Sequence, residues 1–375
     1  MKYLKELAVR YPNVAAASTE IINLQAILHL PKGTEHYVSD VHGEYEKFSH
    51  IIRNGSGAIR SRIEDEFGNT LTTKQKKNLA SVIYYPEQKM DLMEEELPKN
   101  FLLEWQHDTM VRLVHVARSV GNKYTRSKVR KAMSPEFAYV MEELMVEHRR
   151  ADKKRYVEQI LETIIMTGRV RQFIAAMAHL IQDLTIDHLH VIGDIYDRGS
   201  GPHRIMDCIM KTANVDIQWG NHDILWMGAA CGNDACICSV IRNNLKYDNV
   251  EILENAYGIS LRQLILFGMK TYGIEDGIKA ALAAVTVILF KLEGQLIKAH
   301  PEYEMSDRLL LGQMDDTKNK VMIEGEWVTM NTNVFPTVDL ADPYELTEEE
   351  TRRLIAWVKE KKENQDFLFS LKDSY

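Results

Sequence analysis

The chain has 375 residues, which is enough for one large domain or for roughly two or three smaller ones. Its composition, 45% hydrophobic and 27% charged, is that of a soluble globular protein with a sizeable core. The formal net charge of −8 argues against a general binder of nucleic acid or of anionic membranes, which needs a basic surface.

The first residues, Met-Lys-Tyr-Leu-Lys-Glu, lack the apolar stretch of a signal peptide. The longest apolar run, 280–290, is well short of the roughly 20 residues that a membrane span requires, and it predicts a buried helix. We therefore expect a protein of the reducing cytoplasm, without a transmembrane segment.

Three strand–loop–helix units follow one another along the chain. β-Branched and aromatic residues predict three strands, each ending in a polar or glycine-containing cluster. The predicted strands are 35–39, 189–192 and 215–219. The predicted helices after them are 44–53, 203–211, which has Pro202 in its first turn, and one from Ile224 onward. This order indicates a largely parallel sheet covered by helices, with ligands at the carboxyl ends of its strands.

About 150 residues separate the first strand from the second, far more than one crossover helix needs. Apolar residues recur there at three-to-four spacing, which is typical of helices. The helices predicted in this way are 102–120, 136–149 and 153–166. We therefore expect 55–180 to be a helical insertion that separates two parts of one core, 1–54 and 181–242.

The remainder, 243–375, is predicted to be an incomplete mixed α/β extension. Its expected elements are a helix at 277–292, strands at 320–323 and 326–329, and a charged helix at 348–363. Glu324-Gly325 is the expected turn between the strands. Thr347 and Glu350 stand in capping-box register at the start of the charged helix.

Side chains with metal-ligand chemistry follow each of the three predicted strands. The clusters are Asp-Val-His-Gly at 40–43, Gly-Asp-Ile-Tyr-Asp-Arg-Gly at 193–199 and Gly-Asn-His-Asp at 220–223. A carboxylate and an imidazole at one strand end can bind one ion, and a carboxylate from the next strand can bridge two. Two ions about 3.5–4 Å apart can clamp a phosphoryl group. All three clusters in this order predict a two-metal phosphoesterase.

The three clusters resemble the calcineurin-like metallophosphoesterase superfamily, whose pattern is Asp-x-His, Gly-Asp-x-x-Asp-Arg and Gly-Asn-His-Asp/Glu. The resemblance implies an α/β sheet-and-helix core, here with a large helical insertion. It implies that Asp40 and His42 hold the first ion, that Asp194 bridges the two ions, and that Asn221 holds the second. Manganese, iron and zinc all suit such nitrogen and oxygen ligands.

The same resemblance implies roles for three residues at the phosphoryl group. His222 would be the general acid toward the leaving alkoxide, and Asp197 would orient it. Arg198 would clamp the phosphate, for which its planar guanidinium is suited.

Longer segments resemble the class III fructose-1,6-bisphosphatases of bacteria. They are 39–45, 123–131, 190–199, 216–228 and 291–295. The resemblance runs through most of the chain, including the helical insertion. It implies manganese-dependent hydrolysis of the 1-phosphate of fructose 1,6-bisphosphate, a step of gluconeogenesis. The expected partner is a sugar phosphate, without nucleic acid or membrane, and a homo-oligomer is left open.

A basic cluster interrupts this acidic chain within 123–131. Arg126, Lys128 and Arg130 are its members that we expect to contact substrate. One interpretation is a solvated helix face. The other is a site for the second phosphate of a bisphosphate, or for an anionic effector.

One departure from the superfamily pattern lies downstream of His222. Superfamily enzymes use two further histidines for the second ion, whereas this sequence has only His300, interpreted as a surface residue. The chain therefore resembles an N-terminal portion of such an enzyme and is expected to fold yet be nearly inactive. The alternatives are a protein phosphatase or dinucleotide polyphosphate hydrolase of the superfamily, and an inactive fragment that acts only by interaction.

Overall fold

The computed structural model describes residues 2–30, 32–147, 153–212 and 214–352. Contacts divide the chain into two compact units. Unit 1 is Met1–Tyr37 with Lys47–His190, and unit 2 is Val38–Glu46 with Val191–Tyr375. This grouping joins the N-terminal helices to the helical stretch, which the domain boundaries expected at 54, 180 and 242 do not. Those boundaries remain a prediction.

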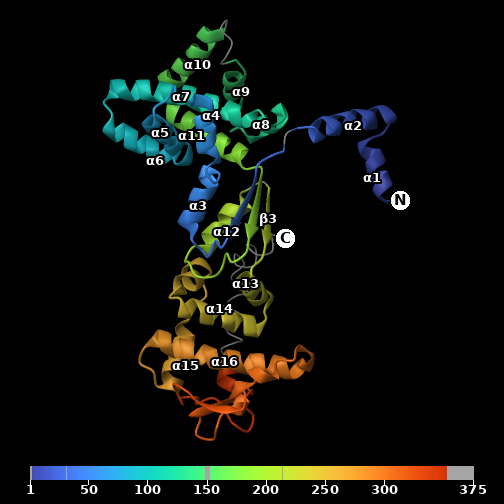
Figure 1. Ribbon diagram of the computed structural model, residues 1–375, viewed down its shortest axis with the longest axis vertical. Helices are drawn as coiled ribbons and strands as arrows, with labels where there is room; N and C mark the ends of the chain where they lie inside the picture. The colour runs from blue at the N-terminus through green and yellow to red at the C-terminus, as the bar shows by residue number, and fades with distance from the viewer. Residues whose placement is uncertain (1, 31, 148–152, 213, 353–375) are drawn as a thin grey trace. The chain divides into compact units, whose positions relative to one another are not determined.

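Helices build unit 1 (Figure 1). They are α1 (Lys2–Arg10), α2 (Val14–Leu28), α3 (Tyr45–Asn54), which begins in unit 2, α4 (Ala58–Phe67), α5 (Thr73–Tyr84), α6 (Pro86–Glu96), α7 (Lys99–Gly121), α8 (Arg126–Ala132), α9 (Ala138–Glu147), α10 (Lys154–Met166) and α11 (Val170–Thr185). The three helices predicted from apolar spacing are confirmed as α7, α9 and α10, within three residues at each described end.

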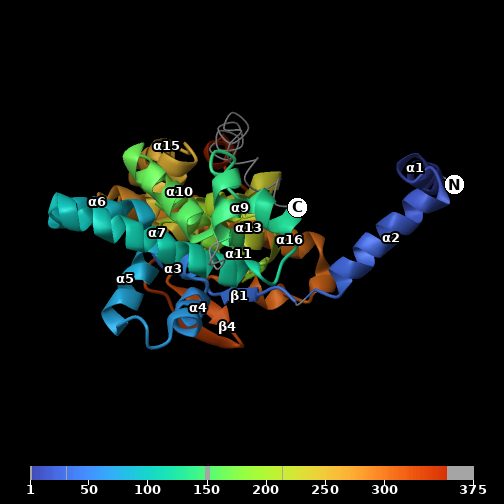
Figure 2. The same ribbon diagram turned by 90° about the horizontal axis from the view of Figure 1, so that it is seen from above.

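The core of unit 1 forms where α7 and α11 pack against each other and against their neighbours (Figure 2). Met110 and Leu113 of α7 and Phe173 and Ile174 of α11 are fully buried there. Burying one such side chain contributes about 1.5–3 kcal/mol, so apolar spacing along these helices is sufficient to assemble the unit.

Three strands form one small parallel sheet in the order β1-β2-β3. They are β1 (Glu35–Ser39), β2 (His188–Ile192) and β3 (Val215–Gln218). All three predicted strands are confirmed within one residue, and the α/β class is confirmed with helices predominating. The carboxyl ends of β1 and β2 and the whole of β3 belong to unit 2.

Two helices follow the sheet in unit 2, α12 (Pro202–Met210) and α13 (Asn221–Cys231). Helix α13 is the helix predicted from Ile224 onward, and it begins three residues earlier than predicted. The reason is the Asp223 carboxylate, which accepts the Gly220 N–H at 2.9 Å and caps the first helical turn.

The rest of unit 2 includes a hairpin. Its elements are α14 (Asp234–Lys246), a π-helical turn (Ile252–Ala256), α15 (Arg262–Tyr272), α16 (Gly277–Ala299), three 3₁₀ turns (Pro301–Tyr303, Ser306–Arg308, Leu310–Gln313), β4 (Lys320–Ile323) and β5 (Glu326–Thr329). Strands β4 and β5 are antiparallel, with Ile323 opposite Glu326. The turn predicted at Glu324-Gly325 is confirmed, and both residues have the positive φ, 51° and 85°, that tight hairpins need.

Helix α16 is the one described helix long and apolar enough to cross a membrane. The core helix of a soluble protein has the same composition, and α16 has buried residues from Ala280 to Gly294. It packs against α14 and α15. The helix predicted to be buried over 280–290 is therefore confirmed.

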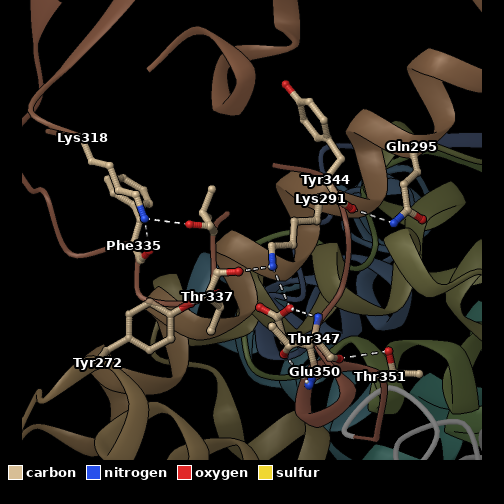
Figure 3. A network of polar contacts seen from close by, with 11 residues as sticks. Tyr272, Lys291, Gln295, Lys318, Phe335, Thr337, Tyr344, Thr347, Glu350 and Thr351 are labelled. Carbon is tan, nitrogen blue, oxygen red and sulfur yellow. Dashed lines mark hydrogen bonds and ion pairs between the residues drawn. The ribbon is translucent and has the colours of Figure 1, made fainter. Parts of the chain in front are cut away.

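A buried ion pair joins α16 to the segment after the hairpin (Figure 3). Lys291 and Glu350 are fully buried, and Lys291 Nζ lies 2.9 Å from Glu350 Oε2. Lys291 also donates to the Thr337 carbonyl at 2.6 Å. The predicted capping box is confirmed, because Thr347 N donates to Glu350 and Glu350 N donates to Thr347 Oγ1. The rest of the charged helix expected at 348–363 lies beyond residue 352, outside the described residues.

Candidate metal centre

Backbone hydrogen bonds tie the three strand-end loops of unit 2 together. His42 N donates to the Asp194 carbonyl at 2.8 Å, and Gly193 N donates to the Gln218 carbonyl at 2.7 Å. Asp40, His42 and Asp194 all have positive φ, between 47° and 52°. A left-handed backbone is uncommon in residues other than glycine, although Asp and His adopt it more often than most, and it is found where surrounding structure imposes it, often at functional sites.

Glycines let these loops approach more closely than any side chain would permit. A Cβ on Gly220 would lie 2.1 Å from Asp194 Oδ1. A Cβ on Gly43 would lie 2.5 Å from the Gly199 carbonyl oxygen, and one on Gly199 would lie 2.5 Å from the His42 carbonyl oxygen. The predicted clusters are therefore packed against one another through their glycine backbones.

The first cluster presents a carboxylate and an imidazole to the same space. His42 Nε2 lies 3.8 Å from Asp40 Oδ1. The other ring nitrogen, Nδ1, lies 2.8 Å from Asp197 Oδ2. A histidine that binds a metal through one nitrogen typically has a carboxylate at the other, which fixes the ring and its tautomer. His42 has such neighbours, because Asp40 lies near its Nε2 and Asp197 lies near its Nδ1.

Asp197 is the polar centre of the site. Its side chain is only 4% exposed and lies close to three other side chains. Besides His42, these are His222 Nε2, 3.3 Å from Asp197 Oδ1, and Arg198 Nε, 2.9 Å from Oδ2. Sequence reasoning connected Asp197 with His222, but it missed the shorter approach to His42. Arg198 is two-thirds exposed, so its guanidinium is accessible from solvent.

The Asp194 carboxylate shows whether a metal ion would fit at this site. Its Oδ1 is buried and has no hydrogen-bond partner in the described part of the chain. A buried carboxylate oxygen without a donor is costly, and a bound cation can satisfy it. Asn221, in the first turn of α13, directly follows the Gly220 that packs on Asp194. The residues present therefore fit a cation.

Asp223 is a positioning residue to which sequence reasoning assigned no role. Its Oδ1 accepts the Tyr196 N–H and its Oδ2 accepts the Gly220 N–H, both at 2.9 Å. One buried carboxylate thus joins the second loop to the third. Burial raises the pKa of Asp223, while these N–H donors act in the opposite direction. The sequence signal for this role was the position of Asp223, three residues after Gly220, where an acidic side chain can accept the N–H of the residue that precedes a helix.

The predicted residues at the metal centre and the predicted basic residues belong to different units. Arg126, Lys128 and Arg130 are on α8 in unit 1. Lys128 forms an ion pair with Asp187, whereas Arg126 and Arg130 line a pocket. His300 is half-exposed, with Nδ1 2.9 Å from Glu302 Oε1, as expected of a surface histidine.

Comparisons with known proteins agree on one family. The model of the family described as Firmicute fructose-1,6-bisphosphatase matches residues 2–368. The class 3 fructose-1,6-bisphosphatase of Clostridium novyi is 48% identical over 370 residues, which is 93% of this chain and 55% of the relative. The class 3 enzyme of Fusobacterium nucleatum is 48% identical over 94% of this chain and 57% of its own length.

A third relative, the class 3 fructose-1,6-bisphosphatase of Listeria monocytogenes, is 47% identical over 95% of this chain and 57% of its own length. The chain thus spans somewhat more than half the length of the curated relatives it matches. No solved structure gives a significant match.

Proposed function

Since the chain belongs to the Firmicute fructose-1,6-bisphosphatase family, we propose that it is part or all of a metal-dependent phosphomonoester hydrolase. The proposed reaction converts fructose 1,6-bisphosphate to fructose 6-phosphate and phosphate, a step of gluconeogenesis in the cytoplasm. The single observation that carries the proposal is the buried, unpartnered Asp194 Oδ1 at the junction of three strand-end loops. A calcineurin-like metallophosphoesterase core is the proposed fold.

The proposed ligands of the first ion are Asp40, His42 and Asp194. The second ion would share Asp194 and take Asn221. When bound, two such ions neutralise phosphoryl charge and activate a water. All four residues supply oxygen or nitrogen donors, which suit Mn²⁺, our first choice, and also suit iron or zinc.

The chain's own polar residues would act on the ester. Arg198 would bind phosphoryl oxygens through its exposed guanidinium. His222 would give a proton to the leaving alkoxide, with Asp197 holding its ring. Asp197 also lies beside His42, so it would couple the position of the proton donor to that of a metal ligand.

The second ion is expected to bind weakly to this chain. In the described residues it would have two protein ligands, Asp194 and Asn221. Neutral imidazole is a better ligand than water for these metals, so a site lacking histidine has low affinity. We therefore expect about one tightly bound ion and low turnover from the 375-residue chain.

The test is metal stoichiometry and turnover measured on the same purified chain. Fructose 1,6-bisphosphate, a phosphopeptide and a diadenosine polyphosphate are offered in turn with Mn²⁺. The proposal expects phosphate release from the sugar bisphosphate alone, lost in an Asp194→Asn variant that keeps the side-chain volume. Glu302→Gln, an exposed carboxylate beside His300, is the matched control. Preference for either other substrate, or Mn²⁺ binding that ignores Asp194, would refute it.

A further inference from the structure

Unit 1 contains a pocket of about 380 Å³ formed by α7, α8 and α9 and the turns between them. Three arginines line it: Arg118 from α7, and Arg126 and Arg130, one turn apart on α8. Its floor is apolar, because Val129, Met133 and Met145, all less than 10% exposed, complete the lining. A hollow of this size suits a small molecule rather than a polymer.

The pocket has an unbalanced positive charge. Glu142 is its acidic residue, and Glu142 Oε2 lies 2.9 Å from Arg130 Nη1. Neither Arg118 nor Arg126 has an ion-pair partner among the described residues. Arg118 is moreover half-buried, where a guanidinium without an acceptor is unfavourable. Three arginines and one glutamate leave a formal charge of +2 in an otherwise acidic chain.

Helix α8 separates its basic residues by face. Lys128 turns to Asp187, with which it forms an ion pair, and its ammonium lies 4.3 Å from the centre of the Tyr124 ring. Arg126 and Arg130 line the pocket instead. The basic cluster is therefore not one uniformly solvated face, because one cation is used structurally and two are directed to a hollow.

We propose that this pocket binds a small organic phosphate. A phosphate monoester carries about −1.5 to −2 charges at neutral pH, which matches the charge of the pocket. Guanidinium groups bind phosphate oxygens through paired N–H donors. The carbon part of the ligand lies on the floor of Val129, Met133 and Met145. Inorganic phosphate satisfies the arginines alone, and an uncharged apolar molecule satisfies the floor alone.

The test is calorimetric titration of the full chain in EDTA, so that the proposed metal centre and its activity do not contribute. The probe is phenyl phosphate, and the comparators are inorganic phosphate and phenol. We expect phenyl phosphate to bind more tightly than either comparator. Arg126→Gln should weaken its binding about tenfold or more, the scale of one lost charge-assisted hydrogen bond. Arg126 is exposed, so this variant keeps the fold.

Lys131→Gln is the matched control, because Lys131 is on the same helix, is exposed and does not line the pocket. It should leave the Kd within about twofold. Equal weakening by Arg126→Gln and Lys131→Gln, or binding of phenol as tight as that of phenyl phosphate, would refute the proposal.

A last titration separates two sources of the phosphate. Arg126-dependent binding of fructose 1,6-bisphosphate at least as tight as that of phenyl phosphate assigns the pocket to a phosphate of the proposed substrate. Weaker binding of the sugar assigns it to a separate phosphorylated ligand. Either result supports a phosphate site in unit 1, whatever the fate of the proposed hydrolase activity.

Discussion

Replacing Gly220 with alanine should disrupt the proposed metal centre through a single methyl group. The Gly220 backbone, at φ −80° and ψ 173°, suits any residue, so alanine adds no backbone strain. Its Cβ would lie 2.1 Å from Asp194 Oδ1 and 2.5 Å from Asp194 N. Observed Cβ contacts essentially never fall below 3.0 Å, so the carboxylate must move by 3.0 − 2.1 = 0.9 Å or more. The backbone contact prevents relief by rotation of the side chain alone.

A displacement of that size is large for the proposed ligand Asp194, because metal–ligand distances are held to about ±0.2 Å. Disturbing the support of a ligand commonly lowers metal affinity by about 10–100-fold. We expect at least this loss for Mn²⁺ in Gly220→Ala, measured by calorimetry, with unchanged far-ultraviolet circular dichroism.

Gly273→Ala is the matched control, made in the same unit. Gly273 has φ +69°, and a methyl group added there would meet no atom within 4 Å, so alanine costs only backbone strain of about 1–2 kcal/mol. Metal affinity should stay at the unsubstituted value. Mn²⁺ binding that is equally tight in Gly220→Ala and Gly273→Ala would refute the reasoning about the Asp194 carboxylate.

Three further changes test the remaining arguments. In an active preparation, His222→Asn should lower turnover by about 10²–10⁴-fold with metal content unchanged, since it would remove the proposed proton donor and none of the proposed ligands. Loss of metal would show the proposed role to be wrong. Lys291→Met should destabilise unit 2 by about 3–5 kcal/mol, because it leaves the Glu350 carboxylate buried without its partner. The loss should be seen as faster amide exchange over 337–350. Adding Glu350→Gln should restore slow exchange, and no restoration would contradict the pairing. Burial and the Lys123 charge lower the pKa of His36 from 6.5. The contribution of His36 to stability is therefore present above pH 6.5 and is lost as the pH falls below that value. His36→Leu should flatten the pH dependence of the urea midpoint between pH 7 and 5.5, and an unchanged slope would count against this reasoning.

Features encoded by neighbouring residues could be predicted from the sequence. Helices α7, α10 and α16 follow from apolar spacing, since a buried stripe needs one pattern whatever it packs against. The hairpin follows from Glu324-Gly325, because positive φ is a local property. The three ligand clusters could be located for the same reason, as each directly follows its own strand. Their roles in binding metal remain a prediction.

Contacts between residues far apart in the sequence were decided by the tertiary structure alone. Asp197 lies beside His42 as well as His222, and its approach to His42 has no signature in the residues around it. Lys128 forms an ion pair with Asp187, whereas Arg126 and Arg130 line the pocket. This difference depends on where Asp187 and α9 lie in space, because nothing in the local sequence distinguishes the three cations. Local patterns specify which elements form and what chemistry they carry. Which carboxylate meets which cation is specified only when those elements pack, because an ion pair requires proximity in space and leaves no periodic trace along the chain.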